Sequence, residues 1–187
     1  EKAGIPVLVL QPLVYGFSMG VVRHWLGCPN VDVKVVTDYV QNITESLVQE
    51  GFRKIVFLDC HGNHDCVLRM VMRIIADKYN VFTMTLSPFA LAGDVYQKLK
   101  RDPEGDIHGG EYETSMMLHI RPELVNTELY TNVDAIRCNS PLRGPVSTWG
   151  LQETKTGLFG DPTYATAELG RVMAEAAVVK AVEYVRA

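Results

Sequence analysis

The sequence of 187 residues lacks any long hydrophobic run and any cluster of basic residues. A membrane-spanning helix needs about 20 consecutive apolar residues, so we expect no membrane span. The net charge is −4, and the lysines and arginines are scattered along the chain. Proteins that bind nucleic acid usually gather basic residues on one surface, so no nucleic-acid partner is expected. Small molecules or other proteins are the expected partners.

Cysteine is scarce, with Cys28, Cys60, Cys66 and Cys138 as its only positions. Four cysteines in a chain of this length are too few for a secreted disulfide scaffold, and no CxxC pair typical of structural zinc occurs. We therefore expect reduced thiols and a cytoplasmic location. The loops GxGxxG and GxxxxGK[ST] are also missing, which argues against nucleotide binding through them.

The composition, with 47% hydrophobic and 21% charged residues, suits one globular domain over residues 1–187. The opening EKAGIPVLVLQPLVYG has only a short apolar run, interrupted by Pro6 and Pro12 and without a cleavage pattern. It predicts a strand rather than a signal peptide. Because the chain begins at Glu1 rather than Met and enters this strand almost at once, we expect an upstream segment to be missing.

Three short apolar runs rich in β-branched residues predict strands buried on both faces, as in a parallel sheet. They are IPVLVL (5–10), KIVFLD (54–59) and VFTMTL (81–86). Between them, apolar residues at helical spacing predict amphipathic helices within 37–51 and over 65–79, the second ending at Asn80. Further helices are expected over 93–100, 111–120 and 167–186, and residues 140–163 predict an irregular segment for function or oligomer contacts.

The stretch DCHGNHD follows the second predicted strand, where ligands bind in open α/β sheets. Imidazole and carboxylate groups suit zinc, manganese or iron, and Gly62 allows a sharp turn, so His61 is the first candidate ligand. An ordinary polar turn is the alternative, because Asp59 and Asn63 form turns readily and Asp65 is a good helix cap. On that interpretation His64 faces solvent.

A second candidate segment is HGGEYETSMML, in which two glycines follow His108 and precede a predicted helix. Glu113 shares helical spacing with Met116, Met117 and Ile120, so it is predicted to head the apolar stripe. A buried ionised carboxylate must be paired, hydrogen-bonded or bound to metal. The alternative is a first-turn glutamate held by the helix dipole and by free backbone N–H groups.

A cysteine enzyme is a weaker interpretation. Cys60 and His61 could act as nucleophile and base, but adjacent residues at a strand end point in opposite directions, and no third activating group is evident.

Four segments together resemble the creatininase (creatinine amidohydrolase) family. LVYGFS is similar to the family's PxxYGxS, and EGFRKIVFLDCHGNH to its hGFxxIxxxNGHGGN turn. HGGEYETSMML resembles HAGxxETSxML, and GLFGDPTYATAELG resembles GxxGDPxxAT. The resemblance extends over nearly the whole chain, and the middle two motifs are the most specific.

The resemblance implies a layered α/β/α fold with a mainly parallel sheet. It also implies a metal-dependent hydrolase that acts on a cyclic amide or other small C–N substrate and often assembles as a homo-oligomer, commonly a hexamer. By the same resemblance His61 and Glu113 are metal ligands and His108 acts in proton transfer. Gly109, Gly110, Tyr15 and Ser18 fall at the substrate. The cofactor would be one or two divalent ions of Zn, Mn or Fe.

Two features depart from the family pattern. The segment GSxEQHGPHLPLxTD, which carries the remaining ligands in the family, has no counterpart in this sequence. The usual asparagine pair of NGHGGN is replaced by Asp59 and His64. We therefore expect a domain that lacks its N-terminal strand and metal-ligand loop, with a substrate preference of its own.

The resulting hypothesis is that metal-activated water attacks an amide-like carbonyl while His108 stabilises the oxyanion or shuttles a proton. Two alternatives stay open. A related metal-dependent hydrolase could cleave a C–C or C–O bond beside a ketone, and a degenerate subunit could bind a small molecule without catalysis.

Overall fold

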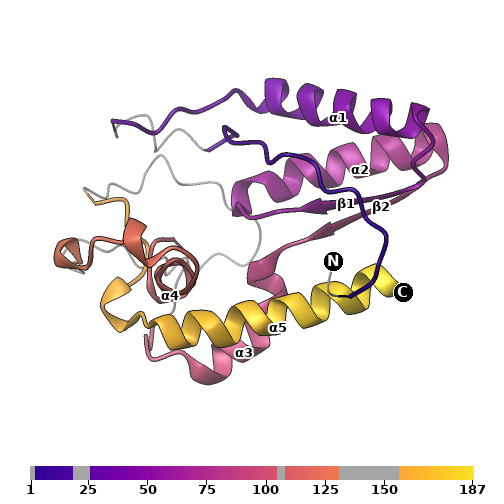
Figure 1. The fold of residues 1–187 in the computed structure, drawn as a ribbon. Helices are drawn as coiled ribbons and strands as arrows, with labels where there is room; N and C mark the ends of the chain where they lie inside the picture. Colours follow the sequence, from indigo (N-terminus) through magenta and orange to yellow (C-terminus); the bar gives the residue numbers. More distant parts are fainter. Residues whose placement is uncertain (1–2, 19–25, 105–107, 131–155) are drawn as a thin grey trace. The chain divides into compact units, whose positions relative to one another are not determined.

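The computed structural model describes residues 3–18, 26–104, 108–130 and 156–187 (Figure 1). These residues form two compact units, Glu1–Ala90 with Arg186, and Leu91–Val185 with Ala187. The single domain expected from length and composition stays a prediction.

The first unit is built around two parallel strands and two helices. Its elements are α1 (Val33–Gln49), β1 (Lys54–Leu58), a 3-10 turn (Gly62–His64), α2 (Asp65–Tyr79) and β2 (Phe82–Leu86). The two strands run in register from Lys54 opposite Phe82 to Leu58 opposite Leu86. Both helices lie on the same side of the strand pair (Figure 1). Two of the three predicted strands and their parallel pairing are thereby confirmed.

Local capping sets the ends of these helices. The Asp32 carboxylate accepts the N–H of Lys34, so α1 begins several residues before the predicted segment. Asn80 adopts the left-handed conformation, with φ of 49°, and its N–H bonds the Ala76 carbonyl. This is the predicted end of α2, because asparagine tolerates that conformation better than most residues.

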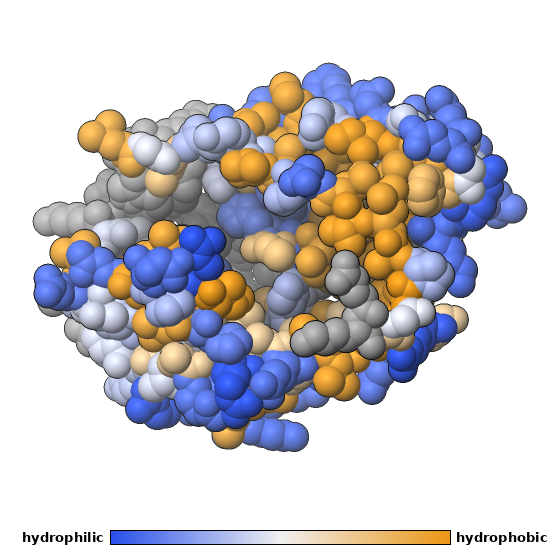
Figure 2. Space-filling view, in the orientation of Figure 1, coloured by the Kyte–Doolittle hydropathy of each residue, from blue (hydrophilic) through white to orange (hydrophobic). Residues whose placement is uncertain are grey.

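The core of the first unit lies between the helices and the strands. Its buried members come from α1, β1, α2 and the residue just before β2, namely Val48, Ile55, Val71, Ile75 and Val81. The exposed side of the unit is also apolar, because Val56 of β1 and Phe82 of β2 are 39% and 54% exposed. Figure 2 shows apolar side chains gathered over the strand pair and the N-terminal segment.

The strand predicted at residues 5–10 is wrong. This segment belongs to no strand, and Leu8 and Val9 are 61% and 83% exposed. Its composition suits a strand, but a strand exists only where a neighbouring chain supplies hydrogen-bond partners. Among the described residues, β1 and β2 pair only with each other. The apolar pattern therefore identified a β-prone segment without showing whether it would be paired.

The second unit is helical. It contains most of α3 (Pro88–Leu99), α4 (Glu111–Ile120), most of α5 (Ala167–Arg186) and 3-10 turns at Pro122–Leu124, Thr127–Leu129 and Pro162–Tyr164. The predicted bounds of α4 and α5 are confirmed, whereas α3 begins earlier, with Pro88 in its first turn. None of the helices in the described ranges is long and apolar enough to cross a membrane. The predicted irregular segment 140–163 lies outside the described residues up to position 155.

The predicted apolar stripe on α4 is wrong. The buried residues of this helix are Glu111, Tyr112 and Ser115, whereas Met117 and Ile120 are 39% and 54% exposed. The reason is the position of α5, which approaches so closely that a Cβ on Gly170 would lie 1.9 Å from the Ser115 carbonyl oxygen. Contact through small residues, rather than the apolar spacing, decides which face of α4 is covered.

Candidate functional site

The turn after β1 is shaped by Asp59. Its N–H donates to the Leu86 carbonyl at 2.8 Å, which extends the strand pairing by one residue. Its buried carboxylate accepts the N–H of His61 at 3.0 Å. The carboxylate thus fixes the backbone of the predicted metal ligand at the carboxyl end of the strand.

Ser18 and His61, predicted at the substrate and at the metal, are in contact. The Ser18 hydroxyl lies 3.0 Å from His61 Nε2. The Ser18 N–H donates to the Asn30 side-chain oxygen at 2.6 Å, and the nearby Val31 N–H donates to the Gly16 carbonyl at 3.0 Å. Residues 16–18 are therefore tied to residues 30–31 through backbone N–H groups and to the turn through the Ser18 hydroxyl.

His64 is a further residue of this turn, which the sequence reasoning left as a solvent-facing side chain in one interpretation. Its Nε2 accepts the N–H of Phe17 at 3.1 Å, so the proton of a neutral ring is on Nδ1, 4.0 Å from the Asp59 carboxylate. Its side chain is only 20% exposed, and its ring packs edge-on against His61 with 4.8 Å between centroids. No local pattern in the sequence signalled this contact, because Phe17 and His64 are 47 positions apart.

Two neighbouring residues contribute less. Tyr15, also predicted at the substrate, is 61% exposed. The thiol of Cys60 is exposed at the turn, but partial burial and the negative charge of Asp59 raise its pKa. A raised pKa lowers the thiolate fraction at neutral pH, and this weighs against a cysteine nucleophile.

In the second unit His108 and Glu113 form a pair. His108 Nδ1 lies 3.4 Å from Glu113 Oε2, and the same oxygen accepts the N–H of Gly109 at 2.6 Å. The two side chains are 48% and 43% exposed. Gly109 has φ of +68°, and a Cβ there would lie 2.8 Å from the Leu158 side chain. Glycine is therefore required where the chain turns from His108 toward the helix.

The start of α4 completes this arrangement. Gly110 is the N-cap and carries no capping side chain. The Thr114 hydroxyl donates to the Gly109 carbonyl at 3.2 Å, and the Thr114 N–H donates to the Gly110 carbonyl at 3.1 Å. Glu113 is thus a first-turn glutamate that accepts a backbone N–H, as the alternative interpretation predicted, and its carboxylate is not buried. Its ionisable neighbour is His108.

His108 is anchored through its backbone. It forms an antiparallel bridge with Phe159, in which the His108 N–H donates at 3.3 Å and the Phe159 N–H donates at 2.8 Å. Phe159 is 2% exposed. The bridge ties the histidine to the GLFGDP segment, about 50 residues later in the chain.

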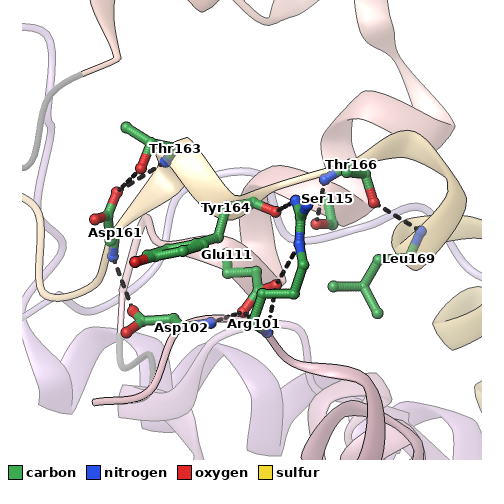
Figure 3. A network of polar contacts seen from close by, with 9 residues as sticks. All are labelled: Arg101, Asp102, Glu111, Ser115, Asp161, Thr163, Tyr164, Thr166 and Leu169. Carbon is green, nitrogen blue, oxygen red and sulfur yellow. Dashed lines mark hydrogen bonds and ion pairs between the residues drawn. The ribbon is translucent and has the colours of Figure 1, made fainter.

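Three buried carboxylates lie near the same segment, and the sequence analysis singled out none of them. Glu111, Asp102 and Asp161 are at most 3% exposed, and Figure 3 shows how they join backbone groups from separate parts of the second unit. Glu111 differs from the neighbouring Glu113 only in that its carboxylate is fully buried. That property depends on contact with the Arg101–Asp102 backbone and cannot be recognised in the local sequence.

The two predicted metal ligands carry donor atoms of types that bind divalent metals. His61 supplies an imidazole nitrogen in the first unit and Glu113 a carboxylate oxygen in the second, and both donors suit Zn²⁺, Mn²⁺ or Fe²⁺. Each unit thus supplies one of the predicted donors, which is fewer than a closed tetrahedral zinc site requires. Within the described ranges, no group of three or more His, Cys, Asp or Glu residues is placed to hold an ion.

Comparison with known proteins identifies one family. The model of the family described as creatininase, creatinine amidohydrolase, matches residues 1–185. A creatinine amidohydrolase from Pseudomonas putida is 30% identical over 141 residues, which cover 66% of this chain and 54% of that protein. A mycofactocin precursor peptide peptidase from Mycobacterium tuberculosis is 41% identical over 71 residues, or 37% of this chain and 28% of that protein. The matches thus cover about half or less of these relatives.

Solved structures agree on the fold. A protein from Bacteroides fragilis assigned as a creatinine amidohydrolase superposes with a TM-score of 0.83 at 24% identity, over 98% of this chain and 72% of that one. A creatininase described with Mn and a creatininase variant of Zn-Zn type superpose with TM-scores of 0.73 and 0.72, at 23% and 22% identity. They cover 92% and 87% of this chain and 72% and 67% of theirs. The predicted layered α/β fold is confirmed.

Proposed function

The chain belongs to the creatininase family, and from this membership we propose that it is a metal-dependent hydrolase that cleaves an amide or related C–N bond of a small molecule. The observation that supports this most directly is the pair formed by His108 and Glu113. One oxygen of Glu113 is committed to the Gly109 N–H and faces His108, and the carboxylate is partly open to solvent. Its other oxygen has no hydrogen bond among the described residues. A metal ligand needs an oxygen in that state.

The proposed cofactor is one or two divalent ions of Zn, Mn or Fe, with His61 and Glu113 among the ligands. A bound divalent ion would polarise a carbonyl and generate a nucleophile from water at neutral pH. The protein's own residues would orient the reacting groups. The Ser18 hydroxyl contacts the His61 ring and would also contact the substrate or a metal ligand, while the Asp59 carboxylate holds the backbone of His61.

His108 would move a proton or stabilise the oxyanion. Phe159 holds the backbone of His108 by two hydrogen bonds. The partly exposed His108 ring faces the Glu113 carboxylate through Nδ1, which leaves Nε2 for the substrate. Gly109 and Gly110 would allow substrate to approach the backbone closely. Tyr15 would contact substrate from the surface.

A second candidate reaction is hydrolysis of an amide bond within a peptide. It is favoured by the identity of 41% with mycofactocin precursor peptide peptidases, which exceeds the identity with the creatinine amidohydrolase over a shorter span. Both reactions place the same demand on the residues above, because each requires attack on an amide carbonyl. A substrate panel with creatinine, other cyclic amides and short peptides would separate them.

A homo-oligomer, with a hexamer as the first expectation, and a cytoplasmic location complete the proposal. Cys28, Cys60 and Cys66 are free thiols, as a reducing compartment would keep them.

The first experiment measures metal content and hydrolysis in the 187-residue chain and in two substitutions, His61→Ala and Glu113→Ala. We expect both variants to hold less divalent metal than the parent chain and to lose at least a hundredfold in turnover, because each removes one proposed ligand. Plasma mass spectrometry would determine the metal, and chromatographic loss of substrate with gain of the hydrolysed product would report turnover. His119→Ala and Glu168→Ala are matched controls, because they remove the same residue types at exposed positions.

Unchanged metal content in both His61→Ala and Glu113→Ala would contradict the metal assignment. Cys60→Ser is expected to keep activity, and its inactivity together with tolerance of chelators would favour a cysteine enzyme instead.

A further inference from the structure

The buried carboxylate of Glu111 has no role in the reaction proposed above. It lies on the first turn of α4 and is fully buried, two positions before Glu113. Its oxygens accept two backbone N–H groups, from Arg101 at 2.9 and 3.0 Å and from Asp102 at 2.9 Å. The Arg101 guanidinium lies 3.8 Å away as its cationic neighbour. A buried carboxylate is expensive unless it is satisfied in this way, so the position of the Arg101–Asp102 backbone is tightly coupled to the start of α4.

Asp102 carries the connection further. It is 1% exposed, and its Oδ2 accepts the N–H of Asp161 at 3.4 Å (Figure 3). Its Oδ1 accepts the N–H of Glu104 at 3.0 Å. Asp161 in turn caps the turn that follows it, by accepting from the N–H and hydroxyl of Thr163 at 2.9 and 2.6 Å. A single carboxylate thus links the Glu111-bound segment to the GLFGDP segment.

The connection ends at the two candidate catalytic groups. Phe159, two positions before Asp161, holds the His108 backbone through the antiparallel bridge. Glu113, two positions after Glu111, reaches back to the Gly109 N–H. The contacts therefore form a circuit that runs from Glu113 through Glu111, Asp102 and Asp161 to His108. The 3.4 Å approach of His108 to Glu113 closes this circuit.

We infer that Glu111 is a positioning residue, whose bonds to the Arg101–Asp102 backbone set the geometry of the His108–Glu113 pair. This inference rests on the proposed function, because it assigns a supporting role to a residue outside the reacting groups. A hydrocarbon side chain could fill the same space without the cost of desolvating a carboxylate. The carboxylate instead provides two directed acceptors, and directed bonds are what a fixed side-chain geometry requires.

The test compares Glu111→Gln with Glu168→Gln. The glutamine replaces one acceptor oxygen with an NH₂ group that faces backbone donors, so the Arg101–Asp102 segment must shift. Glu168 is a matched control, because it is also a first-turn glutamate but lies exposed on α5 with an arginine partner. Circular dichroism and thermal melting establish that each variant is folded.

Two measurements report on the pair itself. The first is the ¹H–¹⁵N resonance of Gly109 in metal-free protein, which the short bond to Glu113 displaces, and Glu113→Ala provides the reference for loss of that bond. The second is the Mn²⁺ dissociation constant. We expect Glu111→Gln to move the Gly109 resonance toward its position in Glu113→Ala and to weaken Mn²⁺ binding about tenfold. Glu168→Gln should change neither.

A folded Glu111→Gln protein with the parent Gly109 resonance and Mn²⁺ affinity would overturn the inference, since a purely stabilising residue would lower only the melting temperature. If Glu111→Gln does not fold, Asp102→Asn decides, because it weakens the next link of the circuit. It should move the His108 and Gly109 resonances, and unchanged resonances would reject the positioning role. If Glu113→Ala leaves Mn²⁺ affinity unchanged, the proposed metal role of Glu113 fails, while the Gly109 resonance still tests Glu111.

Discussion

At the scale of single residues, chemically identical side chains have different tasks. Glu111 and Glu113 occupy the same helical turn, yet one is fully buried against backbone donors and the other is 43% exposed beside His108. Similarly, His61 faces a hydroxyl, whereas His64 accepts a backbone N–H. In each case the group that contacts the side chain decides which chemistry the side chain can perform. Residue type alone indicates only the range of tasks available.

The contact between Gly16 and His64 leads to a prediction. A Cβ at position 16 would lie 2.4 Å from the His64 ring, so Gly16→Ala must displace that ring and release the Phe17 N–H. We expect a loss of about 1–3 kcal/mol in the free energy of unfolding, measured by urea denaturation. Gly62→Ala is the control, because a Cβ there meets no atom within 4 Å.

The double variant Gly16→Ala/His64→Ala tests the cause of that loss. Removing the ring removes the clash, so the double variant should be more stable than the sum of the two single changes. Strict additivity would show that the cost arises elsewhere.

At the scale of elements, packing between helices decides which faces are covered. In the second unit α4 meets α5 at Gly170, and the Thr166 N–H that precedes α5 donates to the buried Ser115 hydroxyl at 3.0 Å. Tyr96 of α3 packs edge-to-face on Tyr112 of α4, with 5.3 Å between ring centroids. These contacts turn Glu111 inward and leave Glu113 accessible.

An ion pair between α3 and α5 predicts a pH dependence of stability. Lys180 donates to Asp94 at 2.7 Å, and this hydrogen bond, with the positive charge, lowers the pKa of Asp94. A group whose pKa is lowered in the folded state contributes stability at pH values above the ordinary aspartate pKa of about 3.9. That contribution is lost as the pH falls through the folded-state pKa. Asp94→Asn should therefore lower the melting temperature slightly at pH 7, and progressively less as the pH falls from 7 through the folded-state pKa.

Thermal melting of Asp94→Asn across this pH range provides the measurement. Asp77→Asn is the matched control on α2, an exposed aspartate that forms no ion pair among the described residues. A melting difference for Asp94→Asn that persists unchanged below the folded-state pKa would show that the pair is not its source. High salt should also reduce the effect, because the pair is solvent-exposed.

At the scale of the whole molecule, the proposed assembly predicts a mass. Apolar side chains of the first unit are widely exposed (Figure 2), including Val9 at 83% and Val14 at 77%. Exposed apolar patches commonly contact other polypeptide segments or chains. We expect sedimentation equilibrium to report a defined multiple of 20.8 kDa at micromolar concentration. A mass of 20.8 kDa at every concentration tested would contradict a homo-oligomer.

The sequence by itself determined the local elements and the candidate site residues. The bounds of α2, α4 and α5 agree with the predictions because helical periodicity and caps such as Asn80 act within a few positions. The pairing of β1 with β2 followed from their apolar composition and the helix between them. The turn chemistry led to His61, helical spacing led to Glu113, and the family motifs led to the role of His108. Their metal and catalytic roles stay predictions.

Only the tertiary structure decided which contacts those residues make. Residues 5–10 have the composition of a strand but no paired partner in the described structure, since strand formation depends on a neighbour. The Phe17–His64 bond joins positions 47 apart, and the buried Glu111 carboxylate accepts backbone N–H groups from Arg101 and Asp102, ten and nine positions away. Hydrogen bonds and burial depend on the distance between residues in space, and the distance between residues along the chain does not determine that spatial distance.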